Sequence, residues 1–280
     1  MKFKLMLSVL TSLTLLTNVS TAFASGTASS QNRRLIWSDE FDGNTINRAN
    51  WTFDIGTGNN GWGNNELQYY TNRNENARVE DGNLIIEAKK ESYNNSNYTS
   101  ARLKTKNLKQ FTYGRIEARM KLPQGQGIWP AFWMLGSSFN GDSDWPQCGE
   151  IDIMEHLNNE KLIHGTLHIK QNNYPKTLGS STPLNSPEDY HVYAIEWNSS
   201  YIKWFVDDTL YYQVPLGGQI KINNNCYYVP NNAIKNEALN KPFFILLNVA
   251  VGGNWPKYPD NTTQFPAKMY VDYVRVYSNN

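Results

Sequence analysis

The chain has 280 residues, with 26 Lys or Arg against 25 Asp or Glu and a formal net charge of +1. Such a balanced charge argues against nucleic acid or an anionic membrane as a partner. A chain of this length can build one large hydrophobic core, and no repeat or Pro-rich linker divides it.

The first 24 residues have the features of a secretory signal peptide. A basic start at Met1–Lys4 precedes an apolar run at Leu5–Leu16, and small residues at Ala22–Ala24 precede the expected cleavage point. The apolar run is too short for a membrane anchor. We therefore expect a secreted, extracellular protein with an N-terminal tail at 25–34 and a single domain at 35–280.

Five segments rich in aromatic and β-branched residues predict strands. They are Leu84–Ala88, Gly114–Lys121, His191–Trp197, Tyr201–Val206 and Met269–Tyr277. Turn-forming residues separate these segments, and no amphipathic helical pattern of useful length competes with them. We expect an all-β fold, a jelly-roll sandwich of two antiparallel sheets whose curved face forms a concave cleft.

The segment Cys148–His156 places three carboxylates in a sequence that otherwise looks like a strand. A strand alternates its faces with a period of two, so Glu150 and Asp152 share one face while the intervening isoleucines point into the core. Glu155 is out of phase with them. One extra unpaired residue, a β-bulge at Ile153 or Met154, would return Glu155 to the face of the other two acids.

Three acids in a row suit the cleavage of a glycosidic bond with retention of configuration. That reaction needs an ionised nucleophile and a protonated acid about 5 Å apart, roles that fit Glu150 and Glu155. Asp152 between them would raise the proton affinity of the acid by like-charge repulsion. An isolated ExDxxE pattern is short and common and fits a solvated strand face better than a catalytic site, so the rest of the chain must decide.

The chain contains nine Trp, 17 Tyr and 11 Phe, which suits a cleft that binds sugar. Trp129 and Trp133 precede the acid strand and Trp255 follows the later Gly252-Gly253 pair. Indole faces stack on the C–H faces of sugar rings, and neighbouring glycines allow close approach of a ligand. For any single Trp, packing in the core is an equally good explanation.

A series of motifs in chain order resembles glycoside hydrolase family 16, and in particular its laminarinases, which are endo-β-1,3-glucanases. The motifs are Trp37–Phe41, Gly61–Thr71, Tyr98–Leu103, Tyr113–Arg119, Gly127–Leu135, Glu150–Glu155, Asn248–Gly253 and Val271–Tyr277. They extend over nearly the whole chain after the signal segment. A set of ordered motifs is a far more specific signal than the acid pattern alone.

The resemblance implies that Glu150 is the nucleophile, Glu155 the acid/base and Asp152 the assisting carboxylate. Expected substrate-binding residues, with Trp255 added for its aromatic ring, are Asn65, Arg102, Trp129, Trp133, His168, Asn248 and Trp255. We expect His168 on a strand beside Glu155, although a lone His is more often structural. Arg102 has the alternative of pairing with a surface acid.

No metal or other cofactor is expected for catalysis, because the four His lack the spacing of a zinc motif and the retaining mechanism needs none. The resemblance does imply a structural calcium on the convex face. Its ligands would be Glu40, the carbonyl of Gly82 and Asp272, which are hard oxygen donors. The alternative is that Glu40 and Asp272 satisfy turn amides.

One region departs from the family pattern, an insertion at 217–241. An ordered loop of this length is usually functional, and Tyr227 and Tyr228 would reach the cleft if it folds over. It also contains Cys226, and Cys148 is the other cysteine of the chain. The two cysteines either form a disulfide that pins the insertion over the cleft, or remain free thiols.

Together these features predict a secreted, monomeric endo-acting enzyme that hydrolyses laminarin-type β-1,3-glucan polysaccharide by double displacement. Alternatives with the same mechanism are mixed-linkage β-1,3-1,4-glucan, a galactan such as agarose, or transglycosylation. The bulged acid motif is typical of laminarinases and galactanases, whereas dedicated lichenases tend to use ExDxE. A non-catalytic β-glucan-binding protein is the alternative from another class, and the presence of all three acids argues against it.

Overall fold

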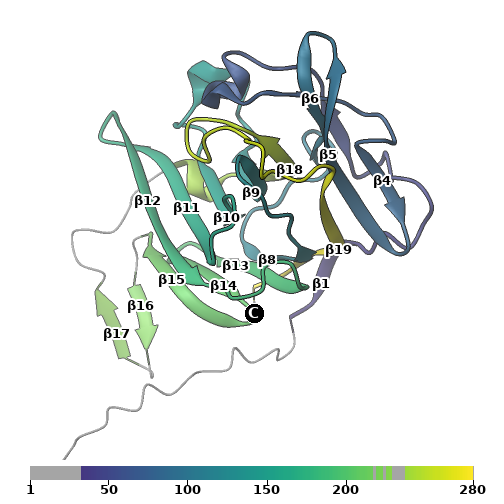
Figure 1. The fold of residues 1–280 in the computed structure, drawn as a ribbon. Helices are drawn as coiled ribbons and strands as arrows, with labels where there is room; N and C mark the ends of the chain where they lie inside the picture. Colours follow the sequence, from purple (N-terminus) through teal and green to yellow (C-terminus); the bar gives the residue numbers. More distant parts are fainter. Residues whose placement is uncertain (1–32, 217–218, 223–224, 229–236, 280) are drawn as a thin grey trace, which may run out of the picture.

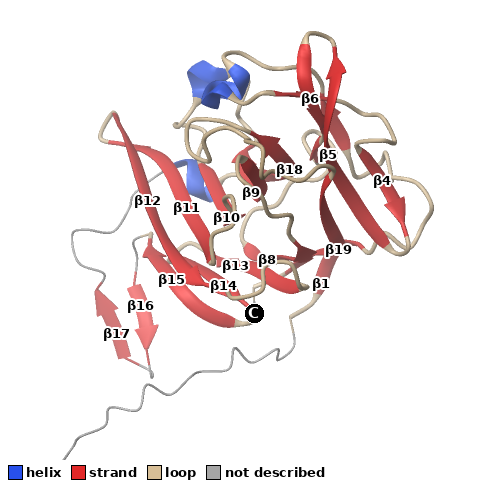
Figure 2. Cartoon of the chain, in the orientation of Figure 1, coloured by secondary structure: helices blue, strands red, loops and turns tan. Residues whose placement is uncertain are grey.

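The computed structural model describes residues 33–216, 219–222, 225–228 and 237–279, and most of its regular structure is β-strand (Figures 1 and 2). The helical turns within these residues are η1 (Gly61–Asn65), η2 (Asp142–Asp144) and η3 (Glu237–Asn240). None of the described helices is long and apolar enough to cross a membrane. The predicted signal segment and nearly all of the tail lie outside the described residues, so these assignments stay predictions.

The smaller of the two main sheets has seven strands, and all of its pairs are antiparallel. In spatial order they are β12 (Tyr174–Pro183), β11 (Leu162–Gln171), β10 (Glu150–Glu155), β9 (Ile128–Gly136), β18 (Phe243–Val251), β7 (Arg102–Lys104) and β2 (Thr52–Asp54). The predicted acid strand is β10, which lies inside this sheet and has a neighbour on both sides.

The larger sheet has ten strands. Its main path is β15 (Thr209–Pro215), β14 (Tyr201–Val206), β13 (His191–Trp197), β8 (Gly114–Lys121), β19 (Ala267–Tyr277), β5 (Asn83–Tyr93), β6 (Ser96–Ser100) and β3 (Gln68–Tyr70), with β1 (Leu35–Asp39) on β19 and β4 (Ala77–Glu80) on β5. The pair β3–β6 is parallel. The five strands predicted from aromatic and branched residues all lie in this sheet.

The two sheets pack face to face around the core, as β18 illustrates. Its alternate residues Phe243, Ile245, Leu247, Val249 and Val251 are buried in the main hydrophobic cluster between the sheets. The residues between them, Phe244, Leu246, Asn248 and Ala250, line a cleft on the outer face of the seven-stranded sheet. Figure 1 shows the two layers, with β9, β10 and β18 above β8 and β13 in this view. The predicted jelly-roll sandwich is confirmed.

The residues expected to hold calcium lie along the larger sheet. Arg275 donates to Glu40 at 2.8 Å, and Arg119 donates to Asp272 at 2.7 Å. Gly82 lies in the turn between β4 and β5. Because both carboxylates are engaged by arginines, this set does not fit a calcium ion unless both pairs rearrange. The calcium site stays a prediction.

The insertion contributes a two-stranded antiparallel pair, β16 (Gln219–Ile222) and β17 (Asn225–Tyr228). The side chains of Cys226, Tyr227 and Tyr228 lie outside the described residues, so the role of the insertion stays a prediction. Cys148 is a buried free thiol whose pKa is raised to about 12, by burial first and then by the charge of Glu150. Such a thiol is inert at neutral pH.

The alternation along β18 yields a test of stability. Ile245→Ala should lower the free energy of unfolding by about 2–4 kcal/mol, because Ile245 is fully buried and its loss leaves a cavity between the sheets. Leu210→Ala, at an edge-strand position that is 47% exposed, is the control and should cost less than about 1 kcal/mol. Urea denaturation followed by tryptophan fluorescence measures both. Equal losses would contradict the assigned core.

Candidate active site

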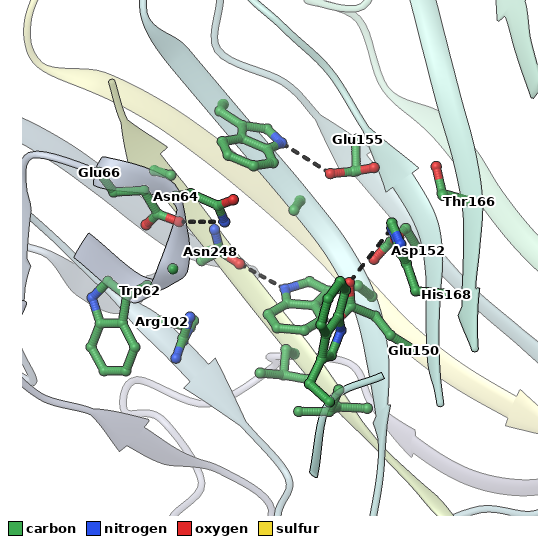
Figure 3. A pocket seen from close by; sticks show the side chains of 18 of the residues that line it. Trp62, Asn64, Glu66, Arg102, Glu150, Asp152, Glu155, Thr166, His168 and Asn248 are labelled. Atoms are coloured by element: carbon green, nitrogen blue, oxygen red, sulfur yellow. Dashed lines mark hydrogen bonds and ion pairs between the residues drawn. The ribbon is translucent and has the colours of Figure 1, made fainter. Parts of the chain in front are cut away.

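A cleft of about 950 Å³ runs across the outer face of the seven-stranded sheet. Strands β7, β9, β10, β11, β12 and β18 form its floor, and residues from the segments 58–66 and 139–145 line its sides. Figure 3 shows the acids of β10 near His168 and Thr166, with Trp62, Glu66, Arg102 and Asn248 on the opposite side. One side of the groove thus holds the three acids of β10, and the opposite side holds Glu66 together with aromatic, amide and arginine groups.

Strand β10 contains the predicted bulge. In its pairing with β9 the register shifts between Asp152 and Met154, so Ile153 has no partner in that described ladder. In its pairing with β11 the register shifts between Asp152 and Glu155. Glu150, Asp152 and Glu155 all line the cleft, while Ile153 and Met154 are buried in the core. The extra residue thus places three acids on one face, as the sequence predicts.

Two tryptophans hold the outer acids by hydrogen bonds. The indole of Trp145 donates to a carboxylate oxygen of Glu150 at 3.1 Å, and that of Trp129 donates to Glu155 at 3.1 Å. An indole N–H is a donor with no acceptor capacity, so both bonds favour a carboxylate oxygen that accepts. Each acid is therefore fixed in direction while its other oxygen stays available.

Burial raises the pKa of all three acids. Burial and then the charge of Asp152 raise the pKa of Glu150 to about 8, and burial raises the pKa of Asp152 to about 8. The pKa of Glu155 lies well above its usual range, because of burial first and then the charges of both other acids. Arg102 and His168 favour the ionised form of Glu150. All three acids therefore favour the protonated form more than a free carboxyl group does.

His168 lies on β11, which is beside Glu155 as expected, but the residue next to His168 on β10 is Glu150. In the register of β10 with β11, His168 is opposite Glu150 and His164 is opposite Glu155. The imidazole Nε2 lies 3.3 Å from Asp152 and 3.8 Å from Glu150. The reason is the antiparallel direction of β11, which returns along β10 from its far end.

Arg102 both lines the cleft and pairs with an acid. Its Nε donates to Asp54 at 2.7 Å, and its guanidinium carbon lies 3.9 Å from the ring centroid of Trp62. Burial would raise the pKa of Asp54, but the charges of Arg102 and Lys104 hold it below its usual range. A half-buried, paired and stacked guanidinium is held in one place, which suits a group that positions a ligand.

Asn248 belongs to a chain of hydrogen bonds behind the cleft wall. Its side-chain oxygen accepts from the indole of Trp133 at 2.8 Å, and its amide donates to the hydroxyl of Tyr70 at 3.2 Å. Tyr70 in turn donates to Glu66 at 3.3 Å. Burial raises the pKa of Glu66, whose carboxylate also lines the cleft. These hydrogen bonds fix the orientation of both the Asn248 amide and the Trp133 indole.

Asn65 and Trp255 differ in placement. Trp255 lines the cleft, is 44% exposed, and its ring packs edge to face on Trp129 at 5.7 Å between centroids. Asn65 does not line the cleft; its amide donates to Asn254 at 2.9 Å, and its neighbour Asn64 lines the cleft instead. Asn65 has a positive φ and ends the tight turn of η1. Its role in substrate binding stays a prediction.

Among the cleft residues that the sequence analysis did not single out are Trp62, Glu66 and Trp145. The first two lie in the motif Gly61–Thr71, where only Asn65 was singled out. Trp145 lies in the loop before β10. The sequence feature that could have identified it is its position five residues before Glu150. Its ring also lies 5.6 Å from that of His168.

Among the described residues, Glu150, Asp152 and His168 form a group that could hold a metal ion, with ligand atoms within 4.8 Å of one another. Each is also explained by the contacts above without an ion. The acid pair flanked by donors is what bond cleavage at a sugar requires: one ionised carboxylate, one proton donor, and aromatic surfaces for the ring.

Comparison with known proteins agrees with this geometry. Residues 64–274 match the model of Glycosyl hydrolases family 16. A Beta-glucanase from Rhodothermus marinus is 46% identical over 251 residues, covering 87% of this chain and 84% of that protein. The Clotting factor G alpha subunit from Tachypleus tridentatus is 45% identical over 247 residues, covering 88% of this chain and 34% of that protein.

Among solved structures, the laminarinase catalytic domain from Thermotoga maritima superimposes with a TM-score of 0.77 at 42% identity, covering 89% of this chain and 100% of that chain. The chain thus spans a whole catalytic domain of one relative and about a third of the length of another. The matched residues include all three acids and most of both sheets. The chain therefore belongs to glycosyl hydrolases family 16.

Proposed function

We propose that the protein is a retaining endo-glycosidase that hydrolyses β-1,3-glucan of the laminarin type. The bulged acid strand carries the proposal, because it places Glu150 and Glu155 on one cleft face with Asp152 between them. A groove lined by aromatic residues from two strands and from the loops beside them suits an internal stretch of polymer. The relatives named as a β-glucanase and a laminarinase support the glucan substrate.

In the first step, Glu150 attacks the anomeric carbon and Glu155 gives its proton to the glycosidic oxygen. The bond from that carbon to oxygen breaks, the leaving sugar departs with the proton, and an ester joins the remaining sugar to Glu150. Trp145 and Trp129 aim the two carboxyl groups. Burial first and then the charge of Asp152 raise the pKa of Glu155, which favours the protonated acid before the reaction.

In the second step, the ionised Glu155 removes a proton from water, and the resulting oxygen attacks the anomeric carbon. The ester bond to Glu150 breaks, and the product has the configuration of the substrate. A sugar hydroxyl in place of water gives transglycosylation by the same route. Asp152 and His168, 3.3 Å apart, support the nucleophile from the β11 side.

We also propose that the protein is exported and that it acts as a monomer. The basic, apolar and small-residue pattern of the first 24 residues supports export. The three acids and the indoles that donate to them all belong to one chain, so the proposed chemistry needs no second copy, which supports a monomer as the acting unit. Sequencing the N-terminus of the exported protein and light scattering of the purified protein test the two points; an uncleaved Met1 or a stable dimer would contradict them.

Substrate choice is tested by incubation with laminarin, lichenan and agarose, followed by product identification. We expect laminarin to be cleaved fastest, with release of a mixture of oligosaccharides from the start of the reaction. Faster cleavage of lichenan or agarose would reassign the polymer while leaving the mechanism in place. Binding of laminarin with no products would support the non-catalytic alternative.

The roles of the two glutamates are tested by substitution. Glu150→Gln should lower kcat by about 1,000-fold or more, because the nucleophile acts in the transition state. Glu155→Ala should regain activity in azide on a substrate with a good leaving group, giving a glycosyl azide of retained configuration. NMR of the product distinguishes the outcomes, and an inverted azide would remove Glu150 from its role.

Stability should fall as pH rises through the range in which the buried acids are protonated only in the folded state. Folding raises the pKa of Glu150 to about 8, and an unfolded glutamate has a pKa of about 4. Between these values the native state binds more protons than the unfolded state, so raising the pH destabilises it.

Glu150→Gln removes this titration. The variant should be more stable than the parent at pH 8 by about 1–3 kcal/mol, with a smaller gain at pH 5. Glu75→Gln, at an exposed position, is the matched control and should change little. Chemical denaturation at both pH values measures the effect. A variant that gains nothing at pH 8 would show that the carboxyl group is not destabilising when buried.

A further inference from the structure

One hydrogen bond crosses the core from the larger sheet to the acid strand. The indole N–H of Trp204, on β14, donates to the backbone carbonyl of Asp152 at 2.8 Å. Trp204 is fully buried, and β14 lies in the layer behind β10 (Figure 1). The accepting carbonyl belongs to the residue at which the register of β10 shifts against both neighbours. The bond therefore meets the acid strand at its bulge.

The neighbouring strand β11 leaves space for this indole. Gly165 is the residue of β11 opposite the bulge. A Cβ atom there would lie 2.6 Å from Cδ1 of Trp204 and 2.4 Å from the hydroxyl oxygen of Tyr211. Because real Cβ atoms do not approach so closely, a larger residue would push the indole away from the bulge. The absence of a side chain at Gly165 thus leaves room for the Trp204 indole on the core side of the cleft floor.

The bulge needs such support because it interrupts the ladder. An extra residue leaves backbone groups of the strand without their usual partners, and a buried carbonyl without a donor is costly. Pairing without the bulge would be regular, but it would turn Glu155 toward the core, because a shift of one residue exchanges the two faces. The donor from Trp204 favours the bulged arrangement over the regular one.

We infer that Trp204 is a positioning residue for Glu155: by donating to the Asp152 carbonyl it holds the bulge that keeps the Glu155 carboxyl group in the cleft. Trp204 lies in the core and contacts no substrate. The inference rests on the proposed acid/base role of Glu155. It predicts that loss of the indole N–H impairs proton donation more than it impairs the rest of the reaction.

A second tryptophan supplies the matched control. Trp197 of β13 is also fully buried, and among the described residues its indole nitrogen has no hydrogen-bond partner. Trp197→Phe and Trp204→Phe remove the same atoms from the same core, so both should lose stability by packing. Only Trp204→Phe also removes a donor to the acid strand. A difference between the two variants therefore isolates the hydrogen bond.

The readout is kcat/KM on two aryl β-glycosides of laminaribiose, one with a dinitrophenol leaving group and one with a poor leaving group. The dinitrophenolate leaves without a proton, whereas the poor leaving group needs the acid. Trp204→Phe should lower kcat/KM about 10- to 100-fold for the poor leaving group and less than about threefold for dinitrophenol. Trp197→Phe should lower both by the same small factor.

Glu155→Ala, measured in parallel, distinguishes a failure of the acid/base role of Glu155 from a failure of the positioning role of Trp204. If Glu155→Ala shows no dependence on the leaving group, the acid/base assignment itself fails. If Glu155→Ala shows it and Trp204→Phe lowers both substrates alike, Trp204 has only a packing role and the inference is overturned. Circular dichroism confirms that each variant is folded at the assay temperature.

A second substitution covers the case in which Trp204→Phe does not fold. Trp204→β-(3-benzothienyl)alanine, introduced by amber suppression, keeps the shape of the indole and replaces its N–H with sulfur. This variant should show the same selective loss on the poor leaving group. If it matches the parent on both substrates, the N–H does not position Glu155 and the inference is overturned.

Discussion

A strand sends alternate side chains to opposite faces, and this constraint governs the whole arrangement around β10. Its apolar residues must face the core between the sheets, while its acids must face the groove. A regular strand satisfies both demands for Glu150 and Asp152 but not for Glu155. The extra residue at the bulge resolves the conflict, and the floor of the groove, the indole donors and the bond from the larger sheet all depend on where that residue lies.

Three carboxyl groups in a row repel one another, and the surroundings, including His168, offset this repulsion only in part. The arginine of the groove is already paired with Asp54, and the indoles of Trp129 and Trp145 supply dipoles rather than charge. The row is therefore held partly protonated by its own geometry. Partial protonation of the buried carboxyl groups is unfavourable for folding, but it supplies a proton donor for catalysis. Active sites commonly lower stability in exchange for activity in this way.

The acids, the bulge and the main strands of the larger sheet could be predicted from the sequence. The reason is that the side-chain period of two of a β-strand can be recognised in residues 84–88, 114–121 and 150–155. The position of His168 could not, since the register of β11 is set by the hairpin that joins it to β10. Trp145 was missed for a related reason. Its hydrogen bond to Glu150 depends on the path of a loop, which carries no periodic signal.

The seven-stranded sheet ends at β12, which leaves one row of backbone groups facing outward beside the groove. An open edge of this kind can recruit strands from other molecules and start aggregation. β12 carries Pro175 and Pro183, which have no N–H to offer, and Lys176 between them adds a charge. The strand is also rich in Ser, Thr and Gly rather than apolar residues. The groove can thus stay open along one side while its border resists pairing with a second chain.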